Sequence, residues 1–433
     1  MGFLAISGRG QSTEGLCRAF EEVIYSTDRD GRSLLERHFS AARETGISNH
    51  LGIPRNPKQR PGGHRSGRPQ AQRSSVEDIL SWASELGLLT SPGVRHSYGL
   101  TKDGHVYRQL VGDKLFDEFR QGTANPFLLP AMERRFLFLQ EISRDCVLVL
   151  LLRKLAEAFP VETHFCRSGS EGKTLVRYLI SAFEAVKADL RAARLSAAEK
   201  ELVDHIAMLQ LSIGEVPDSA NARRAAALRN ARNRAPSNAS DSFKMAKHRL
   251  TPRLEHLADY GYLNGFEGEP GASGESVEFC WTVTRLGHDA AALFRQLPPA
   301  AIHQLDRVED GSFTVPGIRE FLLRHAMRFF ASTESIPTCE ASQADIIKHL
   351  VWAYNVCGMR YGYSEFLGIG KLASLHALES GKLMEIGQVY AFLHEVVPSH
   401  PELSNLIRFA SRPEPENMHI RILDVAKLCE LNI

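Results

Sequence analysis

The 433-residue chain is predicted to be mainly α-helical, with small β-hairpins. Three observations support this fold class. Residues 240–295 combine two short helical patterns, a loop rich in Gly and Glu, and a strand pattern. Residues 74–104 repeat this order with a shorter loop. Residues 114–214, between the two copies, show helical periodicity. We therefore expect two units of helices and a hairpin, joined by a helical middle region.

Residues 14–44 contain two helical patterns, and a basic stretch follows at residues 54–73. That stretch has four prolines, three glycines and no acidic residue, so it cannot bury a core. Its Gly67-Arg68-Pro69 resembles the core of an AT-hook, and a solvated loop is the alternative. We expect the stretch to contact phosphate if DNA lies nearby. Its basic residues are Arg55, Lys58, Arg60, Arg65, Arg68 and Arg73.

The first copy begins at Ser74-Ser-Val-Glu77, which is a capping box for a helix. Glu85-Leu-Gly-Leu-Leu89 and Tyr98-Gly-Leu-Thr-Lys-Asp-Gly104 follow as turn and hairpin. The helix carries Glu77, Asp78 and Glu85, which a phosphate-lined groove would repel. We therefore expect this copy to contact DNA through the preceding basic stretch and its hairpin, or not at all.

The middle region contains two strongly apolar helices, at residues 132–141 and 146–159, which we expect to pack as a pair. This region is either a spacer or a dimerisation surface. Within it, Arg167-Ser-Gly-Ser-Glu-Gly-Lys-Thr174 resembles a P-loop, but Arg167 replaces the first Gly and no strand ending in Asp follows. A capping box, Ser168-Gly-Ser-Glu171, explains the same residues as the start of a helix, and we favour that interpretation.

A second basic stretch leads into the second copy. Residues 223–253 hold nine Lys and Arg against one Asp, in a chain whose net charge is only +1. This is the best local candidate for a phosphate-binding surface, and a solvated helix face is the alternative. The residues that we place in the predicted DNA interface are Arg223, Arg224, Arg229, Arg232, Arg234, Lys244, Lys247, Arg249, Arg253 and His256.

The second copy shows its elements most clearly. Thr251-Pro252 is a favoured helix start, because Thr is a good N-cap and Pro suits the first turn. The helix that follows is expected to end at Gly261. A strand is expected over residues 277–283, and Thr284-Arg-Leu-Gly287 is expected to cap a helix ending at Phe294.

This order of helix, tight turn, helix and hairpin is that of a winged helix-turn-helix. The phrase Asp259-Tyr-Gly-Tyr-Leu263 … Trp281-Thr-Val-Thr-Arg-Leu-Gly287 resembles the end of the recognition helix and the wing of MarR-like regulators. The resemblance identifies a superfamily with at least two copies here, and it implies DNA binding, RNA binding or protein contact. In the usual arrangement, Arg253 and His256 would point to base edges while the preceding cations contact the backbone. The expected wing holds Glu267, Glu269 and Glu275 without Lys or Arg, which departs from a DNA-contacting wing.

The C-terminal third suggests a third winged helix. Helices are expected at residues 318–330, 345–357, 366–378 and 386–397, and strands at 406–411 and 418–423 form a hairpin. The candidate groove helix carries Glu385 and Glu395, so we favour protein–protein contact for this unit.

Composition narrows the alternatives. The seven cysteines are odd in number and never spaced as CxxC, which argues against a disulfide framework or a zinc ribbon and favours buried, reduced thiols in a cytoplasmic protein. The longest apolar run, residues 146–152, is too short to span a membrane. No signal peptide, metal site, cofactor motif or familiar catalytic motif is recognised.

The sequence thus predicts tandem winged-helix domains at residues 1–112 and 216–297, a helical bundle or spacer at 113–215, and a helical domain at 298–433. The leading hypothesis is non-catalytic binding of double-stranded DNA, by a transcription regulator or by the DNA-recruiting subunit of a larger anti-phage or restriction system. A protein partner or self-association is expected as well. One alternative is a scaffold whose winged helices bind protein, and another is a nuclease or ATPase with a degenerate motif.

Overall fold

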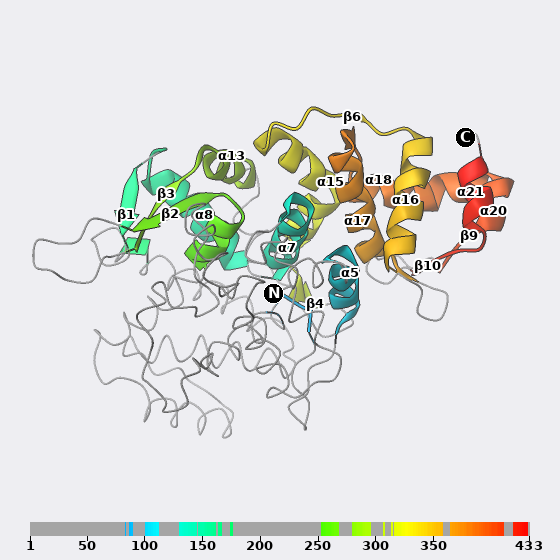
Figure 1. Cartoon of the computed structure of the whole chain (residues 1–433), viewed down its shortest axis with the longest axis horizontal. Coiled ribbons are helices and arrows are strands. Elements are labelled where there is room, and N and C mark those ends of the chain that lie inside the picture. Colours follow the sequence, from blue (N-terminus) through cyan, green and yellow to red (C-terminus); the bar gives the residue numbers. More distant parts are fainter. Residues whose placement is uncertain are drawn as a thin grey trace, which may run out of the picture. The chain divides into compact units, whose positions relative to one another are not determined.

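The computed structural model describes residues 83, 86–89, 100–111, 130–144, 146–161, 163–166, 174–175, 253–267, 279–295, 306–307, 313–314, 316–357, 364–410 and 419–431. Most of these residues are helical and the strands are short (Figure 1), which confirms the predicted mainly α-helical class. The chain divides into two compact units. One comprises residues 1–140 and 320–433, and the other comprises residues 141–319.

The unit of residues 141–319 contains a three-stranded antiparallel sheet. Strands β1 (His164–Cys166) and β2 (Leu263–Glu267) both pair with β3 (Phe279–Val283), so the strand order is β1-β3-β2. Helices α8 (Cys146–Ala158) and α13 (Arg285–Phe294) pack against each other next to this sheet (Figure 1). A two-residue pair, β4 (Asp306–Arg307) and β5 (Phe313–Thr314), completes the described strands of the unit.

Local sequence explains where these elements begin and end. Residues 253–259 are helical, and the chain leaves this helix through Gly261, whose φ of +83° is a left-handed conformation that glycine tolerates. Thr284 caps α13 because its hydroxyl accepts a hydrogen bond from the Gly287 N–H at 3.0 Å. The predicted stop at Gly261, the hairpin and the capped helix through Phe294 are confirmed.

Aromatic side chains fill the core of this unit. Phe159 stacks on Phe165 with ring centroids 4.5 Å apart, and Phe165 stacks on Trp281 at 6.1 Å. Residues 148–152 of α8 are buried, as expected for a core helix. Within the described ranges, none of the helices combines the length and the apolar character that crossing a bilayer requires.

The other unit has a core of packed helices. Helices α5 (Lys102–Val111), α16 (Gln343–Cys357) and α17 (Phe366–Glu379) lie side by side (Figure 1). Helix α17 is buried on almost every side, as expected for a central helix that is apolar all round. Two further helices are divided between the two units. Helix α7 (Ala131–Arg144) belongs to this unit up to Gln140, and helix α15 (Pro316–Thr333) belongs to it from Glu320 onward.

Charged groups inside this unit are paired. The guanidinium of Arg135 on α7 donates to Glu334 from Nε at 3.1 Å and from Nη2 at 2.8 Å, and to Glu379 from Nη1. Lys371 on α17 donates to Gln140, which in turn donates to Asp103 at 2.7 Å. These bonds satisfy polar groups that would otherwise destabilise a buried interior.

The C-terminal part of this unit has a second three-stranded sheet, ordered β7-β10-β9. These strands are β7 (Ser364–Glu365), β9 (Ile407–Ala410) and β10 (His419–Ile422). The helices between them and after them are α17, α18 (Ile386–Ala391), the π-helix η1 (Phe392–Val396), α19 (Val397–Ser399), α20 (Pro401–Leu406) and α21 (Val425–Glu430). A short parallel pair, β6 (Cys339–Glu340) with β8 (Lys382–Leu383), joins the segments before α16 and after α17. The predicted helices and hairpin of the C-terminal third are confirmed.

Candidate nucleic-acid interface

Two of the predicted DNA-contacting residues, Arg253 and His256, have a described position. Both lie on the helical segment 253–259, which precedes β2. The remaining predicted residues lie outside the described residues: Arg55, Lys58, Arg60, Arg65, Arg68, Arg73, Arg223, Arg224, Arg229, Arg232, Arg234, Lys244, Lys247 and Arg249.

His256 lies in the interior of its unit and not on a free helix face. It is 7% exposed, and its Nδ1 lies 2.6 Å from Oε1 of the buried carboxylate of Glu141. The hydroxyl of Tyr260 donates to the other oxygen of the same carboxylate. This placement corrects the expectation that His256 points to base edges, because its imidazole is turned toward Glu141.

The charge of Glu141 is held by its neighbours. Burial alone would raise the pKa of this carboxyl, but the interactions with His256 and the hydrogen bonds from His256 and Tyr260 lower it below its ordinary value. Burial and the negative charge of Glu141 together raise the pKa of the Tyr260 hydroxyl. The carboxylate therefore stays ionised near neutral pH and fixes the segment 253–260 from within.

The rest of the segment 253–259 offers little surface to a ligand. Residues 254–257 are all buried, whereas Arg253, Ala258 and Asp259 are half-buried. Arg253 contributes to lowering the pKa of Glu141, so its positive charge also acts on this internal carboxylate. The described surface of this helix is therefore limited to Arg253, Ala258 and Asp259.

The predicted wing is an antiparallel hairpin over the described residues. Leu263 pairs with Val283 and Glu267 with Phe279, and the connecting residues 268–278 lie outside the description.

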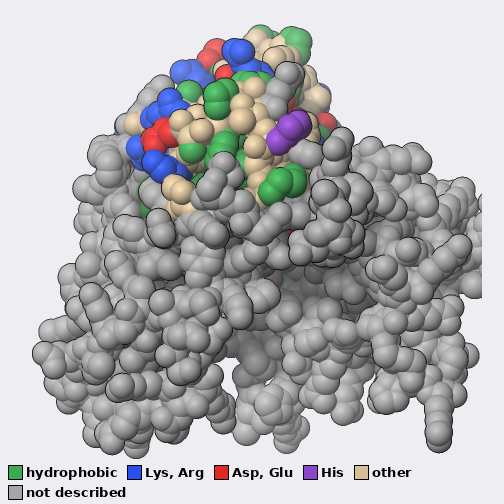
Figure 2. All heavy atoms as spheres, turned by 90° about the vertical axis from the view of Figure 1, so that its left-hand side faces the viewer, with side chains coloured by type: hydrophobic (Ala, Val, Ile, Leu, Met, Phe, Trp, Pro, Cys, Tyr) green, Lys and Arg blue, Asp and Glu red, His purple; other side chains and the backbone are tan. Residues whose placement is uncertain are grey.

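On the described surface seen in Figure 2, Lys and Arg side chains lie beside Asp and Glu side chains and are separated by uncharged ones. That surface does not form a single basic area of the kind that non-specific phosphate binding uses.

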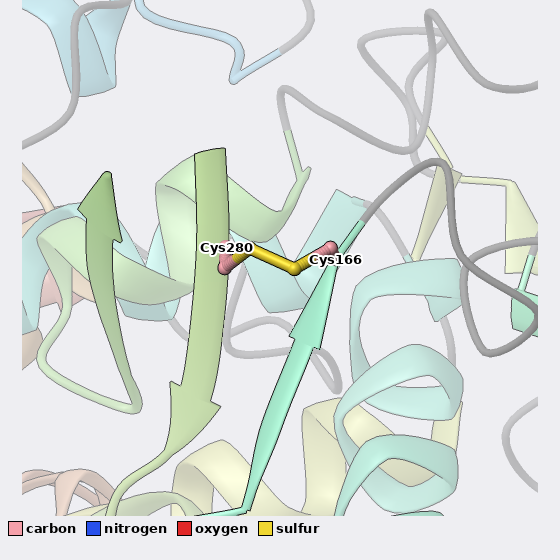
Figure 3. The surroundings of a disulfide bond; sticks show 2 residues. All are labelled: Cys166 and Cys280. Carbon is pink, nitrogen blue, oxygen red and sulfur yellow. A yellow bond between two sulfur atoms is a disulfide. The ribbon is translucent and has the colours of Figure 1, made fainter. Parts of the chain in front are cut away.

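A disulfide links one strand of the wing hairpin, β3, to the neighbouring strand β1. Cys166 on β1 and Cys280 on β3 are direct partners in the antiparallel register and are bonded to each other (Figure 3). Their Cα atoms are 4.3 Å apart, close to the separation of a non-hydrogen-bonded strand pair. The expectation of reduced thiols is wrong for these two residues, because sheet pairing brings together cysteines that are 114 residues apart.

The described free thiols also differ from the expectation of burial. Cys339 and Cys429 are exposed, and Cys357 is half-buried. Burial raises the pKa of the Cys357 thiol to about 12, so it stays protonated at neutral pH. Cys17 and the side chain of Cys146 lie outside the description.

The two predicted copies share one set of local contacts. In the second copy, the hydroxyl of Thr284 donates to Gly261 O at 2.8 Å, and its backbone N–H donates to Tyr262 O at 3.0 Å. In the first copy, the hydroxyl of Thr101 donates to Gly87 O, and its N–H donates to Leu88 O at 3.1 Å. An isolated antiparallel bridge between Leu89 and Leu100 takes the place of the longer hairpin.

The matching glycines complete this repeated turn. Gly87 and Gly261 both have positive φ, of 67° and 83°. One turn into the following helices, Gly104 and Gly287 donate to the hydroxyls of Thr101 and Thr284 at 2.9 and 3.0 Å. A Cβ atom at Gly104 or Gly287 would overlap the carbonyl oxygen of Leu88 or Tyr262. The internal repeat that the sequence predicts is therefore present as a repeated turn and cap.

The C-terminal elements show the same strand order. The strand that precedes α17, β7, pairs with β10, which pairs with β9, just as β1 pairs with β3, which pairs with β2. Glu385 is the N-cap residue of α18, is 4% exposed and accepts hydrogen bonds from the N–H groups of Met327 at 2.9 Å and Arg328 at 2.8 Å. Burial raises the pKa of Glu385 against the effect of these donors. From the sequence, both Glu385 and Glu395 are expected on a helix that contacts a protein partner. That expectation is wrong for Glu385, which is buried, whereas Glu395 is exposed.

In the described part of the chain, His, Cys, Asp and Glu do not gather in groups of three or more that could hold a metal ion. Of the P-loop-like stretch, only Thr174 falls within the description, and it is exposed.

No protein-family model, curated protein or solved structure matches this chain.

Proposed function

We propose that this chain binds duplex DNA without catalysing a reaction on it, as a transcription regulator or as the DNA-recruiting subunit of a multi-protein system such as an anti-phage or restriction assembly. One observation carries the proposal. The basic stretch 223–253 runs directly into a helix that is followed by a tight glycine turn and an antiparallel hairpin. A helix of this kind with cations at its start is a common layout for contacting the phosphates of a groove.

The position of the helix determines which contacts the proposal includes. Residues 254–257 are buried, so the DNA-contacting set is limited to Arg253 and the cations that precede it. His256 is left out, because it is bonded to Glu141. Contacts of this type position a protein on the duplex and are largely independent of base sequence. We therefore expect tight, salt-sensitive binding with little discrimination by this unit among base sequences.

Neutralising cations of the basic stretch tests the proposal. The change of Arg229, Arg232, Lys247 and Arg249 to Gln removes four positive charges from it. If all four contact phosphate, the slope of log K against log salt for a duplex becomes shallower by about 3.6, since each contact contributes about 0.9. Fluorescence anisotropy with a labelled duplex at several salt concentrations measures the slope.

A control variant separates local contact from overall charge. Arg324, Arg328, Lys348 and Lys427 are exposed cations, and their change to Gln removes the same charge from other elements. The proposal expects this control to keep the wild-type slope, with thermal melting used to verify that both variants fold. Equal slopes for the two variants would show that the basic stretch is not the contact surface.

The second candidate is a protein-binding scaffold, and the burial of the segment 254–257 favours it. A helix whose residues 254–257 are buried is suited to packing inside the protein and not to contacting bases in a DNA groove. In that case duplex affinity is absent or insensitive to salt. Light scattering of the pure protein would then show self-association, or mixing with a partner from the same system would yield a complex.

A further inference from the structure

We propose that the imidazole pair of His349 on α16 and His376 on α17 is an acid-sensitive switch in the packing of these two helices. Both helices belong to the unit of residues 1–140 and 320–433. The neutral pair holds α16 against α17, and acid opens the contact. The switch does not depend on the proposed DNA binding, which rests on the other basic residues of the chain.

The two rings meet through the same ring nitrogen. Nδ1 of His349 lies 3.0 Å from Nδ1 of His376, and the ring planes are inclined at 77°. In a neutral imidazole one nitrogen donates and the other accepts, whereas both nitrogens of an imidazolium donate. The contact is therefore a hydrogen bond only while at least one of the two rings is neutral. With a proton on each ring, two donors and two positive charges face each other.

The packing leaves the rings little freedom to move apart. His349 is 1% exposed, so a proton on its ring is shielded from water. His376 stacks on Trp352 of α16, with ring centroids 3.8 Å apart and planes inclined at 16°. His376 is thus held by two side chains of the neighbouring helix. Separation of the two imidazoles requires a change in how α16 packs on α17.

The surroundings disfavour positive charge on both rings. Burial and then the charge of His376 lower the pKa of His349 from 6.5 to about 4. Burial lowers the pKa of His376 as well. The other charged groups that act on the pair are Lys348 and Lys382, which lower the pKa of one or both rings, and Asp345 and Glu379, which raise the pKa of one ring.

Charged groups on the other elements packed against these helices have contacts at other positions. Asp103 of α5 acts on the thiol of Cys357, at the C-terminal end of α16. Lys427 of α21 is paired with Asp424, and Glu385 before α18 accepts from backbone N–H groups of α15. The groups on α16, α17 and β8 therefore set the response of the imidazole pair to acid.

The pKa shift of His349 fixes the direction and the range of this response. Its pKa in the folded chain is below its ordinary value, so the unfolded chain takes up the proton first as the pH falls. The stabilisation by the neutral ring is complete above about pH 6.5 and is lost as the pH falls toward 4. The ion pair between Asp345 and Lys382 persists through this range, because the pKa of Asp345 is about 2.

Hydrogen exchange of the full chain at pH 8 and pH 5 tests the switch, read as protection factors in peptides from α16 and α17. The variant His349→Asn keeps an amide near the position of Nδ1 and takes up no proton. Between pH 8 and pH 5, protection should fall by about 30-fold more in the wild type than in this variant, the factor that a pKa shift from 6.5 to about 4 gives at pH 5. Peptides from α8 and α13, in the other unit, should respond equally in both proteins.

A matched control is His325→Asn, which removes an exposed imidazole from α15 of the same unit and should keep the wild-type response. The second variant, His376→Asn, removes the neighbouring charge and should give a fall in protection between those of the wild type and His349→Asn. Equal falls in the wild type and both variants overturn the proposal. If His349→Asn does not fold at pH 8, the wild-type NMR titration of the His349 ring decides: a midpoint well below 6.5 supports the switch, and one at or above 6.5 overturns it.

Discussion

At the scale of single residues, the carboxylate of Glu141 decides how the candidate DNA-binding helix is held. It accepts hydrogen bonds from Tyr260 and pairs with His256, and all three side chains are buried. A buried carboxylate destabilises the fold when one of its hydrogen-bond partners is removed, because its charge is then left uncompensated. Each partner therefore has a measurable effect on the stability of the unit.

Tyr260→Phe should lower the free energy of unfolding by about 1.5–3 kcal/mol, because it leaves one oxygen of an ionised carboxylate without its donor. Denaturant unfolding of wild type and variant measures the difference. Tyr390→Phe is the matched control, since Tyr390 is only half-buried and its hydroxyl is not part of this cluster. A loss no larger than that of the control would contradict the role assigned to Glu141.

Asp345 gives a pH-dependent prediction. The backbone N–H of Ser342 lowers the pKa of this carboxyl most, against the effect of burial, and the Ser342 hydroxyl and Lys382 add to the lowering, so the pKa falls from 3.8 to about 2. Because the folded-state pKa is depressed, the stabilisation is complete above about pH 4 and is lost as the pH falls toward 2. NMR titration of the carboxyl carbon should show a midpoint near 2. A midpoint near 3.8 would mean that the cap of α16 is not formed.

Sequence reasoning at this scale succeeded where a residue's role is local. The cap at Thr284 and the turn at Gly261 follow from neighbours within a few positions. It failed for His256 and Glu385, because their partners Glu141 and Met327 are distant along the chain. The sequence does not show whether a polar residue on a helix is buried and paired or exposed, because both cases give the same periodicity of apolar and polar residues.

At the scale of elements, the same turn and cap occur twice. Each joins a glycine with positive φ, a threonine that bonds back to it, and a second glycine packed against a carbonyl. The repeat was visible in the sequence because every member is a residue type with a specific backbone role. Strand β1 was not predicted, because three residues are too short to show alternation.

Substitution of the packed glycines tests the repeated turn. Gly104→Ala and Gly287→Ala should each cost at least about 1–3 kcal/mol, since the added Cβ meets a backbone oxygen that cannot move away easily. Gly261→Ala should cost only about 1–2 kcal/mol, because its Cβ has room and the penalty comes from the left-handed backbone alone. Thermal unfolding ranks the three variants. Equal, small losses would contradict the close packing of the two caps.

The disulfide between β1 and β3 should stabilise the sheet that carries the hairpin. Its two cysteines are separated by 114 residues, and closing a long loop reduces the entropy of the unfolded chain. We expect Cys166→Ser to lower the unfolding free energy by about 2–4 kcal/mol under oxidising conditions, and reductant to lower that of the wild type similarly. Cys429→Ser, at an exposed free thiol, should have no effect. A wild type that is unaffected by reductant would contradict the bond.

At the scale of the whole molecule, the distribution of charge along the chain is the basis of the proposed DNA binding. A net charge of +1 gives no general attraction to nucleic acid, so binding requires local concentrations of cations. The chain has one such concentration in residues 223–253. It is evident from composition alone, whereas the burial of residues 254–257 next to it depends on the fold and is not visible in the sequence.

The salt dependence of wild-type binding to a duplex tests the central claim most directly. Anisotropy titrations between about 50 and 200 mM salt give the slope of log K against log salt. The account predicts a slope of about −3.6 or steeper, because it expects at least four cations of residues 223–253 to contact phosphate at about 0.9 each. A slope near zero, or no binding at low salt, would contradict it and leave the protein-binding scaffold as the better account.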